Sequence, residues 1–160
     1  MFKQMMIAAA LIVVPGLASA QAVNGRQYVR MAGASDLYEI QSSRLVLASS
    51  RNAEVRRFAN TMVRHHTKST ADVKRAAQRA GIVPPPPRLD AVGARNIAEL
   101  RRTRGAARDA VYLQQQRVAH RRALELQQGY AANGDVRPLA RTAATIVPVV
   151  QMHLGELRRM

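Results

Sequence analysis

The stretch PLARTAATIVPVVQMHLGEL, residues 138–157, decides the fold of this chain. Its apolar positions recur at intervals of four, three, four, three and four residues, and they hold Leu139, Ala143, Ile146, Val150, His153 and Leu157. This spacing is typical of the seam of an α-helix that is packed between other helices. Pro148 lies inside the pattern and is expected to bend the helix locally. The stretch therefore predicts a helical bundle with one histidine facing its interior.

Upstream of this stretch, the pattern predicts three more long helices and a short one. They cover residues 28–49, 52–81, 90–102 and 107–130, with Val55, Phe58, Met62, Val73 and Ala77 on the inward stripe of the second. Ser50 or Asn52 can cap the second helix, and Asp135 can cap the last one. Gly81 and the four prolines at 84–87 end the second helix. Because no strand alternation occurs, we predict an all-α four-helix bundle with a short extra connecting helix.

The first twenty residues have the features of a secretory signal peptide. Lys3 precedes an apolar run at 5–17, and Ala18-Ser19-Ala20 forms a cleavage site of small residues. The run is too short to span a bilayer, which takes about 20 residues, and no later segment is apolar enough. Residues 1–20 are therefore expected to be removed, leaving a single domain at 21–160 in the periplasm without a transmembrane segment. The chain contains no cysteine, which excludes a lipoprotein anchor and disulfides.

The chain is strongly basic, with a formal charge of +15. Loss of Lys3 with the signal peptide would leave +14, most of it from arginine. Arginine suits phosphate and carboxylate groups, so one hypothesis is a basic interaction protein that binds an anionic envelope component at the periphery of the outer membrane. The alternative is that the arginines form a solvated helical exterior. No dense basic run or basic–aromatic platform predicts specific nucleic-acid binding.

The histidines offer a second hypothesis. At 100° per residue, His66 falls within the inward stripe of the second helix, whereas His65 lies at its edge. His120 shares a stripe with Tyr112, Gln116, Ala123 and Gln127, and His153 lies in the seam of the last helix. On the first helix, we identify Glu39 as the acid that faces the same region. Three long helices thus each direct one histidine inward.

Axial positions can be compared because each helical residue rises by about 1.5 Å. His66 and His120 come out roughly 20 Å from the same end of the bundle whichever way the helices are connected. His153 is expected roughly one turn lower if the helices alternate in direction, and roughly two turns higher if a long crossover precedes the third long helix. A metal–nitrogen bond of about 2 Å makes this difference important.

Two interpretations of the inward histidines stay open. They can hold a single zinc or copper ion, together with Glu39. Alternatively, they are neutral core residues that are hydrogen-bonded to Gln116, Tyr112 or one another. No nucleophile relay or pair of poised carboxylates is readable in the sequence, so no catalytic residue is predicted.

Three segments resemble the bacterial envelope family called domain of unknown function four-one-four-two. They read LYEIQSSRLVLASSRNAEVRRFANTMVRHH, GAARDAVYLQQQRVAHRRAL and IVPVVQMHL, and the resemblance covers almost all of residues 21–160. It implies a ferritin-like bundle and an envelope location, with the family's recurring histidines at His66, His120 and His153 and its acid at Glu39. The family has no agreed biochemical function. Gln41 and His65 stand where acids are common in the family, which weakens any acidic part of a site.

A ferritin-like fold raises the possibility of a di-iron site, which the sequence argues against. Such a site needs Glu-x-x-His on two helices. The residues three positions before His66, His120 and His153 are Val63, Arg117 and Val150. We therefore expect at most one metal ion here, and no ferroxidase centre.

Overall fold

The computed structural model describes residues 23–160, which form five helices and no strand. The helices are α1 (Gly25–Leu47), α2 (Ala53–Arg79), α3 (Ala91–Arg102), α4 (Gly105–Asn133) and α5 (Arg137–Leu157). Each corresponds to a predicted helix, so the all-α prediction is confirmed, and most of the bounds differ by only a few residues. The predicted signal peptide at 1–20 lies outside the described residues.

Polar side chains mark the start of three of these helices. Asn24 and Gln27 form a reciprocal capping box at α1, Asn52 accepts from two backbone N–H groups of α2, and Asp90 accepts from Gly93 of α3. The predicted cap of α5 is wrong. Asp135 instead accepts a hydrogen bond of 2.9 Å from the hydroxyl of Tyr130, in the last turn of α4, and the cap position falls to Val136.

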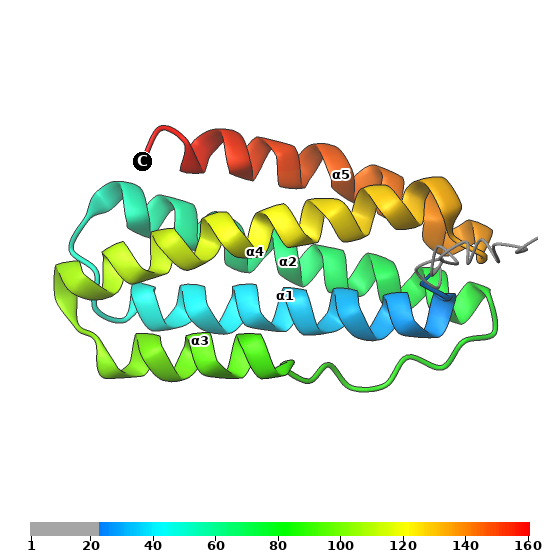
Figure 1. The fold of residues 1–160 in the computed structure, drawn as a ribbon, viewed down its shortest axis with the longest axis horizontal. Helices are drawn as coiled ribbons and strands as arrows, with labels where there is room; N and C mark the ends of the chain where they lie inside the picture. Colours follow the sequence, from blue (N-terminus) through cyan, green and yellow to red (C-terminus); the bar gives the residue numbers. More distant parts are fainter. Residues whose placement is uncertain (1–22) are drawn as a thin grey trace, which may run out of the picture.

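The four long helices run along the longest axis of the molecule (Figure 1). α1 packs against α2 and α4, and α5 packs against the same two helices, so the four surround a common core. α3 packs on the outside, against α1 and α4. The short connecting helix that the sequence predicts thus lies along the outside of the bundle (Figure 1).

Hydrogen bonds between α1 and α4 give the direction of each helix. Tyr28, near the start of α1, donates to Gln127 near the end of α4, while Ser43, near the end of α1, contacts Tyr112 in the first third of α4. α1 and α4 are thus antiparallel, as are α1 and α2, which are joined by a short turn. Consequently α2 and α4 run in the same direction, and the segment 80–90 with α3 forms the crossover between them (Figure 1).

The core consists of two apolar clusters separated by a polar layer. One cluster lies near the start of α1 and comprises Tyr28, Val29, Ala32, Val73, Ala76, Ala77, Ala123, Tyr130, Leu139, Ala143, Ile146 and Val150. The other lies near the end of α1 and comprises Tyr38, Val46, Val55, Phe58, Ala59, Met62, Ile97, Leu100, Tyr112 and Leu157. Along α2 and α5, His66 and His153 are the buried residues between the two clusters. Every predicted inward residue of α2 and α5 is buried.

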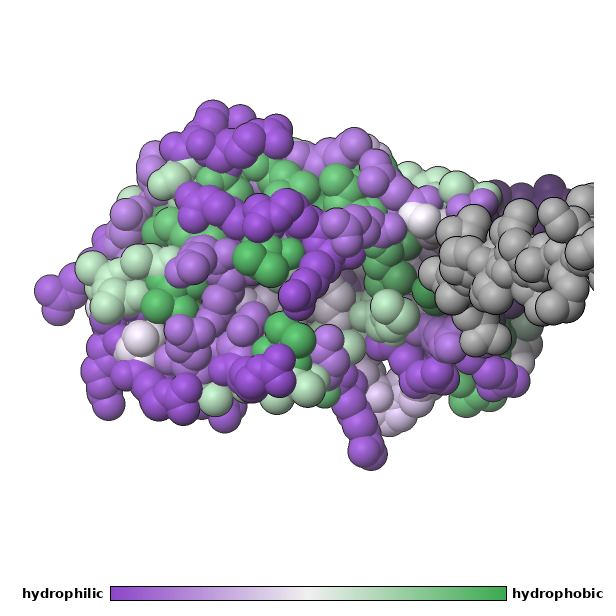
Figure 2. Space-filling view, in the orientation of Figure 1, coloured by the Kyte–Doolittle hydropathy of each residue, from purple (hydrophilic) through white to green (hydrophobic). Residues whose placement is uncertain are grey.

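The exterior is largely hydrophilic on the face seen in Figure 2, with hydrophobic residues exposed among the polar ones. Among residues 23–160, no helix is both long enough and apolar enough to cross a membrane.

Candidate metal centre

All four histidines of the chain meet in the polar layer of the core. The rings of His66, His120 and His153 lie with their centroids 5.2–5.7 Å apart, and His65 stacks on His153 with a centroid distance of 5.1 Å. His66 is 5% exposed, and His120 and His153 are fully buried. Because α2 contributes two of the rings and α4 and α5 one each, this grouping depends on the tertiary structure.

His66 is held by an acid from α1. Its Nδ1 lies 2.8 Å from Oδ1 of Asp36, and the other carboxylate oxygen of Asp36 accepts from the hydroxyl of Thr70 at 3.1 Å. The ring therefore donates from Nδ1 and directs Nε2 into the layer. Nε2 is buried and has no hydrogen-bond partner among the described residues. A carboxylate that orients an imidazole in this way is common around metal ligands.

His120, His153 and His65 form a directional chain of hydrogen bonds. Nδ1 of His120 lies 3.0 Å from the carbonyl oxygen of Gln116, which can only accept, so His120 carries its proton on Nδ1. Nε2 of the neutral ring then accepts from Nδ1 of His153, 3.2 Å away. By the same reasoning, Nε2 of His153 accepts from Nδ1 of His65 at 2.8 Å. One set of neutral tautomers thus satisfies all three contacts.

The ligand atoms of His66, His120 and His153 lie within 4.8 Å of one another. Imidazole nitrogens bind zinc at about 2.0–2.1 Å, so two of them on one tetrahedral ion lie about 3.3 Å apart. The 3.2 Å between His120 Nε2 and His153 Nδ1 already matches that separation. The nitrogen of His66 lies at most 4.8 Å from each of the other two, so a small inward movement of its ring completes a three-nitrogen site. The chemistry of the three nitrogens therefore fits one transition-metal ion.

Glu39 is fully buried beside the histidines but is not one of the three convergent groups. Its Oε1 lies 3.7 Å from His120, on the Nδ1 side of the ring and away from the nitrogen that faces His153. Its Oε2 has no hydrogen-bond partner within residues 23–160. Burial raises the pKa of Glu39 to about 7, against the opposing effect of a charged His66. Near neutral pH this carboxyl group can therefore hold or release a proton.

Burial also separates the histidines by their pKa. It lowers the pKa of His120 to about 3 and that of His153 to about 2, and the positive charge of His66 acts in the same direction. Both rings are neutral at physiological pH, which a metal ligand requires. For His66, burial is outweighed by the hydrogen bond and charge of Asp36 and by the charge of Glu39, so its pKa is raised.

The estimated depth of His153 is wrong. The structure has the crossover connection, for which chain length places His153 two turns above His120, yet the two rings are hydrogen-bonded. The reason is that α5 stops short of the end of the bundle: the carbonyl of its last residue, Leu157, accepts from Arg117 in the middle of α4. The shared level predicted for His66 and His120 is confirmed.

Two residues of the layer are missing from the sequence prediction. Asp36 precedes Glu39 by three residues and so lies on the same face of α1, a spacing that could have revealed it. His65 is more than a boundary residue, because it is half-buried and bonded to His153. Nothing in the pattern of α2 alone distinguishes it from an exposed histidine.

Comparison with known proteins places the chain in a family. The model of the family "Domain of unknown function (DUF4142)" matches residues 14–160. The chain belongs to this family. No curated protein matches it.

Two crystal structures share its fold at low sequence identity. The DUF305 protein of Streptomyces coelicolor, a presumed secreted protein, is 16% identical with a TM-score of 0.69, over 85% of this chain and 89% of its own. A DUF305 fragment from Deinococcus radiodurans is 19% identical with a TM-score of 0.71, over 85% of this chain and 96% of its own. At such identities the likeness concerns the fold alone.

Proposed function

We propose that this DUF4142 protein is an exported protein that binds one zinc or copper ion through His66, His120 and His153. The observation that carries the proposal is the convergence of three ligand nitrogens within 4.8 Å in a fully described core, with Nε2 of His66 unpaired. Asp36 and Gln116 orient two of the rings from outside the site. Such outer partners are characteristic of protein metal sites.

The chain's own groups supply the proton changes that binding requires. His120 already presents a lone pair on Nε2. His153 must move its proton from Nδ1 to Nε2, where it can donate to His65, and His65 must then carry its proton on the other nitrogen. Glu39 balances the charge of the ion by releasing its proton. Glu39 is a neighbouring charge in this arrangement, and it becomes a fourth ligand only if its carboxylate turns past the Nδ1 side of His120.

The architecture around this site fits a ferritin-like bundle, which we propose as its class. Ferritin-like folds join antiparallel helix pairs by one long crossover, as 80–90 and α3 do here. The two buried acids beside His66 and His120 both come from α1, in contrast to the carboxylates from four helices that a di-iron site uses. A single-ion site is therefore the better proposal.

Metal titration of the chelator-treated protein tests this function. We expect saturable uptake of one equivalent of Zn²⁺ or Cu²⁺ by isothermal titration calorimetry, and a rise in melting temperature because the ion binds the native state. His120→Ala should remove stoichiometric uptake. Gln127→Ala is the matched control, because Gln127 is also buried and hydrogen-bonded on α4 but lies two turns away.

The two variants separate a metal site from a structural one. If Gln127→Ala reduces uptake as much as His120→Ala, the loss comes from instability of the bundle. If the unmodified protein shows no saturable uptake of either ion, the histidines are structural and the proposal is wrong.

A further inference from the structure

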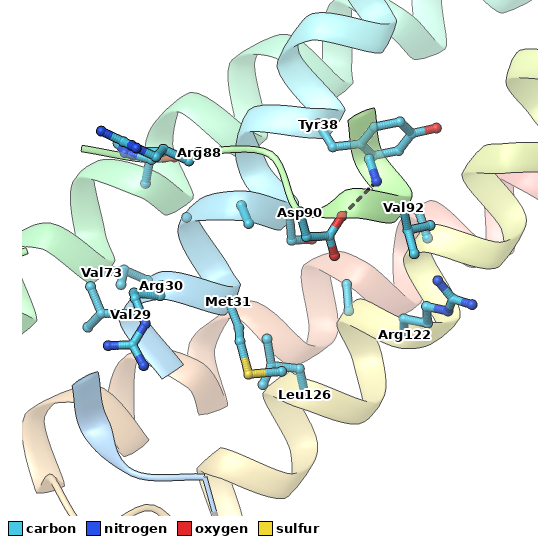
Figure 3. A pocket seen from close by; sticks show the side chains of 18 of the residues that line it. Val29, Arg30, Met31, Tyr38, Val73, Arg88, Asp90, Val92, Arg122 and Leu126 are labelled. Carbon is cyan, nitrogen blue, oxygen red and sulfur yellow. Dashed lines mark hydrogen bonds between the residues drawn. The ribbon is translucent and has the colours of Figure 1, made fainter. Parts of the chain in front are cut away.

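An open groove of about 890 Å³ lies along the outer face of α1, and no histidine lines it. Its walls come from α2, α4, α3 and the proline-rich segment 84–88. Figure 3 shows labelled side chains of these elements around it, with Met31 of α1 close to Leu126 of α4. The volume is within the range of small-molecule sites, roughly 300–1,000 Å³.

The floor of the groove is apolar. It includes Val29, Met31, Val73, Val92 and Leu126 (Figure 3). Met31 is 48% exposed, and Val118, which also lines the groove, is 38% exposed. Exposed hydrophobic side chains gathered in one concave site indicate a binding surface, and methionine adapts readily to a ligand.

Four cations surround this floor: Arg30, Lys74, Arg88 and Arg122. All are exposed, and none forms a salt bridge with another described residue. Asp90 is the acid that lines the groove, and its Oδ1 accepts from the backbone N–H of Gly93 at 2.6 Å (Figure 3). The rim therefore offers uncompensated positive charge beside an apolar surface.

Two hydroxyl groups of the groove are already engaged within the protein, and its proline-rich wall offers few donors to a peptide backbone. The hydroxyl of Tyr38 donates to Gln115, and that of Thr70 is bonded to Asp36 and to the carbonyl of His66. The prolines at 84–87 have no N–H group to donate. A hydrocarbon chain needs no such partners, so it fits the floor better than an extended peptide.

We propose that this groove binds a single-chain amphiphile with an anionic headgroup, such as an alkyl carboxylate, sulfate or phosphate. The alkyl chain lies along the apolar floor, and the headgroup sits among the four cations of the rim. The ligand is a monomer taken from solution rather than a bilayer surface. No histidine lines the groove; its link to the proposed metal centre is Thr70, whose hydroxyl is bonded to Asp36.

Binding of free amphiphiles tests the proposal directly. Decanoate, decyl glucoside and decyltrimethylammonium share one chain length and differ in headgroup charge. We expect decanoate, below its micelle concentration, to bind with a stoichiometry of one, and the neutral and cationic compounds to bind at least severalfold more weakly. Equal affinity for all three would overturn the anionic preference.

Charge reversal at neighbouring arginines locates the site. Arg122→Glu should weaken decanoate binding by roughly five- to thirtyfold, because it replaces attraction by repulsion at the rim. Arg121→Glu is the matched control on α4, since Arg121 is exposed but does not line the groove. Arg30→Glu and Arg26→Glu form the same pair on α1. We expect the control variants to change affinity less than twofold.

Two further outcomes would overturn the proposal. One is the absence of saturable decanoate binding. If the protein then binds anionic phosphatidylglycerol vesicles, and Arg121→Glu and Arg122→Glu weaken that binding equally, the whole basic exterior binds the anionic surface and the groove does not. The other is displacement of decanoate by poly-glutamate at equal concentration, which would assign the groove to acidic peptides. Circular dichroism confirms that each variant is folded.

Discussion

The polar layer and the apolar clusters on either side of it are equally buried. They differ in whether their buried atoms have suitable partners: apolar contacts in the clusters, hydrogen bonds in the layer. In the cluster near the start of α1, Leu139 and Ala143 are fully buried and the stacked rings of Tyr28 and Tyr130 lie 4.0 Å apart. Four buried side-chain polar atoms of residues 23–160 lack a hydrogen-bond partner. Three of them belong to the layer: Glu39 Oε2, His66 Nε2 and Gln116 Oε1.

This contrast indicates that the layer is not there for stability. An unpartnered buried polar atom costs roughly 1–3 kcal/mol, and buried ionic groups are often no better than apolar residues of similar volume. Departures from a well-satisfied core are expected at functional sites. The apolar clusters therefore stabilise the bundle, while the layer between them provides the chemistry.

The largest predicted effect is on stability in the apolar cluster. Leu139→Ala should lower the free energy of unfolding by about 2–5 kcal/mol, since it leaves a cavity in a fully buried position. His120→Leu should cost less, because apolar contacts partly offset the hydrogen bond that His153 loses. Urea unfolding of the metal-free protein measures both values.

For metal uptake, His120→Leu should have the larger effect and Leu139→Ala the smaller one. Leu139→Ala retains the three nitrogens and should bind the ion under conditions where it is folded, whereas His120→Leu should not. If His120→Leu proves as destabilising as Leu139→Ala, the polar layer stabilises the bundle as much as the apolar clusters do, and the division of roles between them is wrong.

The next effect is a loss of stability in acid. Below pH 6.5, His120 and His153 become protonated in the unfolded chain. In the native state the same two rings stay neutral until about pH 3 or lower. Native Glu39, with a pKa of about 7, already holds one proton that the unfolded chain binds only near pH 4.5, while His66 is protonated in both states. The lowered pKa of His65 adds to this difference, so the unfolded state holds at least about one extra proton between pH 6.5 and 4.5. Stability should fall by at least about 1.4 kcal/mol per pH unit there.

Urea unfolding at a series of pH values measures this slope. Below pH 4.5 it should steepen, because Glu39 then becomes protonated in the unfolded chain as well. His120→Leu removes one of the protons that only the unfolded chain binds, so it should lower the slope between pH 6.5 and 4.5 by about 1.4 kcal/mol per pH unit. A slope that this variant leaves unchanged would mean that other groups control the acid sensitivity.

The sequence predicts the scaffold well because local rules determine it. The intervals of four and three in α5 identify its buried face, and Asn52 and Asp90 cap the helices that they precede. Rotation about a helix axis also follows from local geometry, so His66, His120 and His153 are correctly predicted to face inward.

Features that depend on how far one helix slides past another could not be obtained in this way. The level of His153 depends on where α5 ends against Arg117, and the contact of His65 depends on the position of His153. The groove likewise requires the placement of the segment 84–88 beside α1, which no periodicity in the sequence encodes.

The smallest predicted effect concerns His65. Angular position alone suggests that His65→Ala leaves most metal uptake intact, but the 2.8 Å hydrogen bond to His153 gives this side chain a role in orienting the ligand. Loss of such an outer partner typically lowers metal affinity by about 10–100-fold, and the partial exposure of His65 favours the lower end. We therefore expect a roughly tenfold weaker affinity at unchanged stoichiometry. His65→Gln, which can still form a hydrogen bond, should recover part of the lost metal affinity. If His65→Ala instead loses the one equivalent of bound metal, His65 is itself a ligand.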